Sequence, residues 1–237
     1  MNTPYAWQTT TARASGAVFD EGLRQHMLRV YNYMGIGLVV TGLVAFFVAS
    51  TPALYVPIFQ TPLKWVVMLA PLAFIFFFSF RMERMTAASA RTAFFAFSAV
   101  MGLSLASVFL VFTGASIART FFITATMFGA TSLYGYTTKR DLSKFGSFLI
   151  MGLIGIIIAS LVNIFLKSSG LDWIISVIGV IVFAGLTAWD TQKIKEMYSP
   201  MDDGTIAGRK AVMGALSLYL DFINLFLMLL RLFGDRR

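Results

Sequence analysis

The 237-residue sequence contains no cysteine and a single histidine, His26. The lack of cysteine excludes disulfides and thiolate sites for metals or redox chemistry, and one histidine leaves little for a zinc site or a Ser/His catalytic pair. Charged residues are also scarce, at 13% of the chain, which is roughly half of their usual share in a soluble domain. Any chemistry must therefore come from carboxylates, hydroxyls, amides and cations.

What the chain has in excess is apolar sequence, with 58% hydrophobic residues and a mean hydropathy of +0.78. Apolar runs of about 20 residues predict helices that span a bilayer. Seven such runs occur, at residues 28–50, 62–81, 91–113, 116–138, 144–166, 172–194 and 210–232. We therefore predict an all-α polytopic membrane protein with seven transmembrane helices, formed as one domain by residues 21–237.

The first 20 residues are rich in Thr, Ala and Ser and show no apolar period, which predicts a disordered cytoplasmic tail. The first apolar run starts too late and runs too long for an ordinary signal peptide. We expect it to remain in the mature protein, although Ala49, Ser50 and Thr51 weakly resemble a cleavage site.

The basic residues indicate orientation rather than nucleic-acid binding. The net charge is +8, but these residues lie in short loops between apolar runs, with thirteen of the 19 Lys and Arg on the side of the N-terminus. The positive-inside rule places the N-terminus in the cytoplasm, so seven spans would leave the C-terminus outside. An alternative with six spans and a re-entrant last segment would return the tail to the cytoplasm. Ordinary span lengths and the lack of a retention signal fit a plasma membrane.

Two aspartates lie inside apolar runs, Asp190 in FAGLTAWDTQ and Asp221 in LSLYLDFINLFLMLL. Ionisable residues within a membrane are costly and are treated by default as functional. The midpoint between them falls in a polar connection beside Pro200 to Gly204. An antiparallel hairpin folded there would bring both carboxylates to the same depth, on the order of 15 Å from the loop end of each helix.

The last apolar run carries one polar stripe along an otherwise apolar helix. Its members recur at steps of three and four, which is helical spacing, and they are Gly214, Ser217, Asp221, Asn224 and Met228. We expect this stripe to face a cavity or a partner carboxylate. Thr187 shares a helix face with Asp190, but Lys193 and Lys195 follow closely, so Asp190 is alternatively an interfacial residue at a helix end.

Small residues recur at helical spacing within three other predicted helices. They let helices approach closely, or they reflect plain packing. The pairs are Gly35 with Gly42, Ser98 with Gly102, and Gly152 with Gly155.

If Asp190 and Asp221 meet, their proximity determines how they hold protons. Two like charges in a site of low dielectric constant cannot both ionise cheaply, so the pair would share a proton and titrate as a unit. A nearby cation would stabilise the doubly ionised form. Arg81, at the cytoplasmic end of the second predicted helix, is on the correct side, although it equally fits a positive-inside anchor beside Arg84.

The same segments carry a family resemblance. GLTAWDTQKIKEMY followed by ALSLYLDFINLFLMLLRLFG resembles the signature of the Bax inhibitor-1 family, also called the transmembrane Bax inhibitor motif family, in its bacterial form. SLYGYTTKRDLSKFG is similar to another family segment. The resemblance covers nearly all of the chain after the tail.

The resemblance implies six helices around a central, very hydrophobic seventh, and a pH-sensing aspartyl pair that gates a calcium leak. By motif the pair is Asp190 and Asp221, and the arginine that latches it is Arg81, with Arg84 one turn away as a competitor. Two carboxylates are too few for a tight calcium site of six to eight oxygens. Ca²⁺ is therefore expected as a transported ion held transiently near the pair, and no cofactor is expected.

The residues also bear on three alternative functions. Some bacterial relatives are described as modulators of a membrane-bound ATP-dependent protease, so the protein is alternatively a regulator that docks to another membrane protein without transport of its own. An enzyme is not expected, since an intramembrane aspartyl protease would carry GxGD and PAL elements, which Asp190 and Asp221 lack. A retinal photoreceptor needs a lysine within its last helix, where only Lys210 stands, at the entrance.

Overall fold

A computed structural model describes residues 5–237, with side chains from Asp20 onward. The described chain is helical, and its only extended pairing is an isolated bridge between Phe112 and Arg236. The elements are α1 (Tyr5–Ser50), α2 (Pro52–Phe59), α3 (Leu63–Arg81), η1 (Met82–Arg84), α4 (Ala87–Val111), α5 (Gly114–Thr137), α6 (Ser143–Leu166), α7 (Ser169–Glu196) and α8 (Gly204–Phe233).

The seven predicted apolar runs correspond to α1 and to α3 through α8. The short helix α2 was not predicted, and it begins with Pro52 at a first-turn position, where proline lacks only an N–H that would be unpaired anyway. α1 begins at Tyr5, within the predicted tail 1–20. Residues 1–4 and the side chains of residues 5–19 lie outside the described part, so the disordered tail stays a prediction.

Six helices within the described residues are long and apolar enough to cross a membrane: α1 from Asp20, α3 continued through η1, α4, α6, α7 and α8. α5 is as long as α6 but carries more hydroxyl groups. Several of these face inward, including Thr120 and Thr124, and the Thr124 hydroxyl donates to the Thr120 carbonyl oxygen at 2.7 Å. Six of the seven predicted spans are therefore supported within the described residues.

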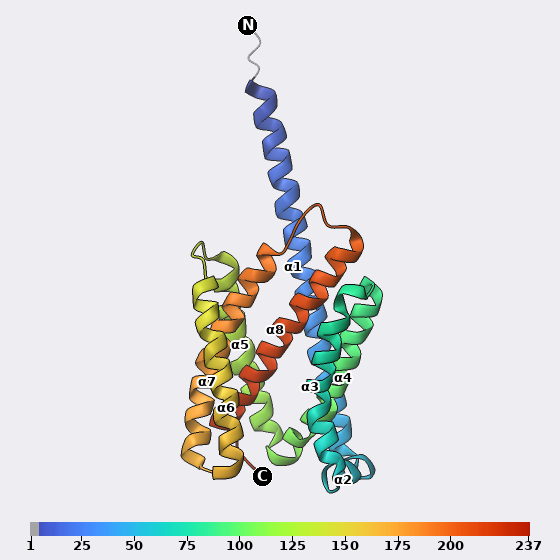
Figure 1. Ribbon diagram of the computed structural model, residues 1–237, viewed down its shortest axis with the longest axis vertical. Coiled ribbons are helices and arrows are strands. Elements are labelled where there is room, and N and C mark those ends of the chain that lie inside the picture. The colour runs from blue at the N-terminus through green and yellow to red at the C-terminus, as the bar shows by residue number, and fades with distance from the viewer. Residues whose placement is uncertain (1–4) are drawn as a thin grey trace.

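Helix α8 is the most buried of the six candidates, with 67% of its most apolar segment buried, against 11% for α3 and for α6. It packs against α1, α4, α5 and α7 and crosses the bundle obliquely (Figure 1). Leu218, Tyr219 and Leu225 are completely buried on it. Any polar group on its inner faces is therefore enclosed by neighbouring helices.

α7 and α8 form the antiparallel hairpin that the polar connection predicted (Figure 1). Asp203 caps α8, with its Oδ1 accepting hydrogen bonds from the backbone N–H groups of Thr205 at 2.8 Å and Ile206 at 2.7 Å. Lys210 then pairs with Asp202 at 2.6 Å, which ties the connection to the first turns of α8.

The C-terminal residues are held at the opposite end of the bundle from the α7–α8 connection (Figure 1). The Thr113 N–H donates to the Asp235 carbonyl oxygen at 3.0 Å, and the Asp235 N–H donates to Ser116 Oγ at 2.8 Å. These bonds fix the end of α8 against the α4–α5 connection.

Candidate functional site

Asp190 and Asp221 lie on facing surfaces of α7 and α8, close enough for their carboxyl groups to interact electrostatically. Asp221 is 5% exposed. The hairpin thus brings together the two aspartates that the sequence placed at one depth.

Both carboxyl groups line one cavity of about 610 Å³ between α3, α6, α7 and α8. Four of the five stripe residues of α8 line it, namely Ser217, Asp221, Asn224 and Met228. The fifth, Gly214, packs instead against Ile194 of α7, where an added Cβ would lie 3.1 Å from the isoleucine side chain. The polar stripe therefore faces a cavity, as its spacing indicated.

One oxygen of this site has no partner. Among the described residues, Asp221 Oδ2 is buried and makes no hydrogen bond. Lys193 follows Asp190 by three residues on α7, and its ammonium group lies over the Trp189 ring at 5.1 Å from its centroid. The site is thus acidic, with one acceptor available to a further donor or cation.

The two threonine hydroxyl groups near Asp190 on α7 are already engaged in hydrogen bonds. Thr187 donates to the Phe183 carbonyl oxygen at 2.8 Å, and Thr191 donates to the Thr187 carbonyl oxygen at 2.7 Å. Thr191 also shares a 2.9 Å hydrogen bond with Ser132 of α5. Sequence reasoning missed this link from α7 to α5, since hydroxyl residues on apolar helices carry no signal of their partner.

Arg81 does not reach the carboxyl pair in this structure. It ends α3 with an exposed side chain, and within the described residues it makes no hydrogen bond or ion pair. The last α3 residue that lines the cavity is Ile75, which lies about 9 Å from Arg81 along the helix axis. Arg84 is likewise exposed and unpaired in the described part of the chain.

No third carboxylate, histidine or cysteine joins the pair: the described residues contain no group of three or more such side chains that could hold a metal ion. Two carboxylates fall short of the six to eight oxygen ligands of a stable calcium site. The arrangement can hold a proton between two oxygens and can attract a cation transiently.

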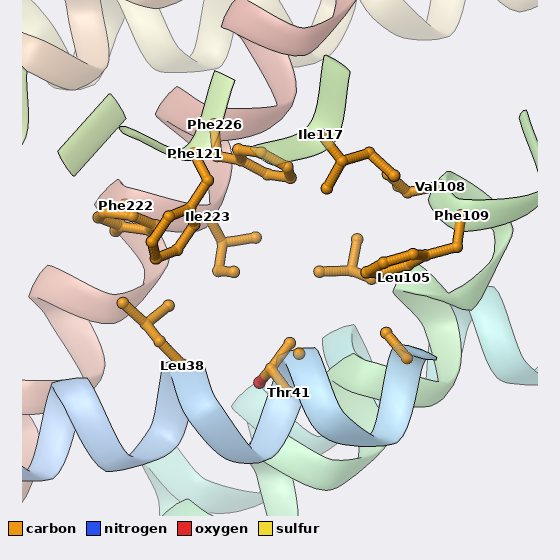
Figure 2. Close-up of a pocket in the computed structure, with 12 residues that line it drawn as sticks. Leu38, Thr41, Leu105, Val108, Phe109, Ile117, Phe121, Phe222, Ile223 and Phe226 are labelled. Atoms are coloured by element: carbon orange, nitrogen blue, oxygen red, sulfur yellow. The ribbon is translucent and has the colours of Figure 1, made fainter. Parts of the chain in front are cut away.

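A second, smaller cavity lies on a neighbouring face of α8 (Figure 2). It measures about 90 Å³ and is enclosed by α1, α4, α5 and α8, with Phe222, Ile223 and Phe226 contributed by α8. Thr41 supplies its only polar side chain, and that hydroxyl is engaged in hydrogen bonds to Ser98 and Tyr219. A cavity with these walls offers no ligands to an ion.

Comparison with known proteins identifies the family. Residues 23–237 match the family described as inhibitor of apoptosis-promoting Bax1. An uncharacterized protein of Rickettsia prowazekii is 50% identical, over 97% of this chain and 98% of its own. The inner membrane protein YbhL of Escherichia coli is also 50% identical, over 91% of this chain and 94% of its own. An uncharacterized protein of Caulobacter vibrioides is 46% identical, over 100% of this chain and 98% of its own. This chain therefore belongs to the Bax inhibitor-1 family, as a bacterial-type, multi-pass membrane protein.

Proposed function

We propose that the protein is a pH-sensitive calcium leak channel whose conduction is controlled by protonation of the Asp190/Asp221 pair. The observation that carries this proposal is the shared cavity: two carboxyl groups from different helices interact inside the bundle, and one Asp221 oxygen is unpartnered. Intramembrane carboxylates with a partner and a cavity are typical of proton and ion pathways.

The proposed control follows from competition between protons and cations for the same oxygens. When the pair holds a proton, the two carboxyl groups bind each other through it and present little negative charge to a cation. When the proton leaves, two like charges repel each other, and a hard cation such as Ca²⁺ relieves the repulsion. With only two carboxylates the cation is released readily, which suits a slow leak rather than storage.

The proposed channel has seven spans, with α5 as the seventh and α8 in the centre. α5 has 24 residues and would be about 36 Å long, enough to cross a hydrocarbon core of about 30 Å. It packs against α7 and α8 as the spans do. The charge distribution in the loops then gives a cytoplasmic N-terminus and an external C-terminus.

Arg81 is proposed as the latch in a second conformation. Its exposed, unpaired guanidinium is free to move, and a shift of α3 toward α7 would bring it to the carboxyl pair. An arginine there would favour the doubly ionised pair. The present structure is, in this scheme, the unlatched conformation.

The test is Ca²⁺ entry into dye-loaded proteoliposomes stepped from about pH 8 to about pH 6. We expect flux in the wild type and loss of its pH response in the double variant Asp190→Asn/Asp221→Asn. Asp172→Asn is the matched control, because Asp172 also lies on α7 but pairs with Arg231 at 3.6 Å, away from the cavity. Arg81→Gln should alter the pH response more than Arg84→Gln.

The proposal fails if the folded double variant shows the same flux as the wild type across this pH range. If folded wild-type protein gives no flux above empty liposomes, the leak is excluded under these conditions. The alternative role, docking to another membrane protein such as a membrane-bound ATP-dependent protease, would then be pursued by crosslinking.

A further inference from the structure

The cavity that contains Asp190 and Asp221 opens sideways, between α3 and α6. Its rim residues Leu72 of α3 and Ile157 and Leu161 of α6 are 53%, 52% and 55% exposed. In Figure 1, α8 is visible between these two helices. Apolar side chains exposed at mid-helix face the lipid of a bilayer, so the cleft is accessible from the hydrocarbon.

The cleft is polar at one end and apolar at the other. Asp190 and the α8 residues Ser217 and Asp221 lie toward the end nearer the α7–α8 connection, whereas Asn224 lies about 6 Å before Met228 along α8. From there the cleft continues between α6 and α7 to its far end, with one hydroxyl, from Ser160, on the way. The far end is lined by Ile164, Phe183 and Met228. This is the polarity of an amphiphile, with a head group at the carboxyl pair and a tail beyond it.

Its dimensions fit one hydrocarbon chain. The lining residues of α6 extend from Ile150 to Ile164, a length of about 21 Å. The cleft is elongated along α6, as the binding of one extended hydrocarbon chain requires.

The carboxyl groups of Asp190 and Asp221 at the polar end of the cleft favour a positively charged head group that can donate hydrogen bonds. Carboxylates only accept hydrogen bonds, and Asp221 Oδ2 has no donor among the described residues although Asp221 is 95% buried. Among the described residues Asp190 makes no ion pair, and the ammonium group of Lys193 lies over the Trp189 ring instead. An ammonium group would supply both the missing donor and a compensating charge.

We propose that the cleft binds a single-chain alkylammonium amphiphile from the bilayer, with its ammonium group between Asp190 and Asp221 and its hydrocarbon chain along α6 toward Ile164. The site uses the same carboxyl pair as the proposed ion pathway, but binding does not require that the protein conducts calcium.

Trp189 lines the cleft beside Asp190, so it can report occupancy. In a background with Trp7, Trp65 and Trp173 replaced by Phe, a dodecylamine carrying a nitroxide near its head group is titrated into micelles, beside dodecanol with the same label. We expect the amine to quench Trp189 at a concentration about tenfold lower than the alcohol, since a charged hydrogen bond is worth about that factor or more. In Asp190→Asn/Asp221→Asn the two labels should quench equally.

A second pair of variants leaves the carboxyl groups intact. Ile157→Phe narrows the cleft and should weaken quenching by the amine severalfold, whereas Ile158→Phe, at an equally exposed position outside the cleft, should not. Equal quenching of the wild type by amine and alcohol would overturn the proposal and mark the cleft as a seat for ordinary lipid chains. If neither the amine nor the alcohol quenched Trp189, the proposal would also be overturned, because that result is expected when protein covers the cleft. Since no calcium is present, these outcomes are independent of the flux experiment.

Discussion

The hydroxyl groups of Thr41 on α1 and Tyr219 on α8 lie 2.6 Å apart in the fully buried interior of the bundle. Thr41 also donates to the Ser98 carbonyl oxygen of α4 at 2.8 Å, so the Tyr219 hydroxyl is the donor to Thr41. Phe94 and Phe97 pack edge-on against the tyrosine ring. Two hydrogen bonds of the Thr41 hydroxyl thus join α1, α4 and α8.

Tyr219→Phe should destabilise the protein with little change in packing. Removal of an interhelical hydrogen bond in a membrane protein costs about 0.6–1.7 kcal/mol, and the loss should appear in the free energy of unfolding measured in mixed micelles. Tyr134→Phe is the matched control, because Tyr134 is 49% exposed on α5. Equal stability of the two variants would show that the Thr41–Tyr219 bond contributes nothing.

Gly102 and Gly42 both belong to pairs of small residues at helical spacing, but they differ in their surroundings at the α1–α4 interface. An added Cβ on Gly102 would lie 2.7 Å from the Thr41 carbonyl oxygen and 2.8 Å from Val44 Cβ, whereas on Gly42 it would meet nothing within 4 Å. Gly102→Ala should therefore cost about 1–3 kcal/mol through overpacking. Gly42→Ala should raise stability by about 0.5–1 kcal/mol, because alanine favours the helix.

Thermal unfolding of the two variants side by side tests this prediction. Gly42 lines the small apolar cavity of Figure 2, so the new methyl group enters empty space. The same sign of change in both melting temperatures would contradict the assignment of close helix contact to Gly102 alone.

These glycines show that close helix contacts could be predicted from the sequence only in part. Spacing marked Gly35, Gly42 and Gly155 as candidates for close helix packing, yet all three face open space. Gly102 and Gly152 do meet a neighbouring helix. The spacing of small residues shows that they share one face of a helix. Which helix packs against that face depends on the packing of the whole bundle, and the sequence of one helix does not determine that packing.

The candidate site was more predictable, for a physical reason. The α7–α8 hairpin brings Asp190 and Asp221 together, and the α8 stripe gives the rotation of that helix toward the cavity. The expected equal distance of about 15 Å from the loop end of each helix was wrong, because Asp190 lies about 9 Å from the end of α7 and Asp221 about 26 Å from the start of α8. Arg81 shows the limit of this reasoning. Its position fixed its depth at the end of α3, but its exposed side chain depends on how far α3 lies from α7.

A further prediction concerns pH and the start of α6. Hydrogen bonds from the side chain and the backbone N–H of Ser143 lower the pKa of Asp141 below its ordinary value of 3.8, and the backbone bond measures 2.8 Å. Because the pKa of Asp141 is lower in the folded state, its ionised carboxylate stabilises the protein at any pH above the ordinary pKa. This stabilisation is lost as the pH falls through the folded-state pKa. Asn cannot titrate, so the melting temperature of Asp141→Asn should fall less than that of the wild type when the pH is lowered from 7 to about 3. Identical losses would contradict the prediction.

The last prediction concerns Gln192, which holds the α5–α6 connection against α7. Its Oε1 accepts from the Leu142 N–H at 2.8 Å, and its Nε2 donates to the Arg140 carbonyl oxygen at 2.8 Å. Gln192→Leu keeps the volume but leaves a buried N–H unpaired, which should cost about 1–3 kcal/mol. Gln25→Leu, at an exposed position of α1, is the control.

Hydrogen exchange separates this effect from a general loss of packing. In Gln192→Leu the amide of Leu142 should exchange faster, while amides in the middle of α8 keep their protection, because only the connection loses its anchor. Acceleration spread evenly over both segments would mean that the substitution disturbs the whole bundle. An unchanged rate at Leu142 would mean that its N–H is protected by the fold of the connection itself and not by the glutamine.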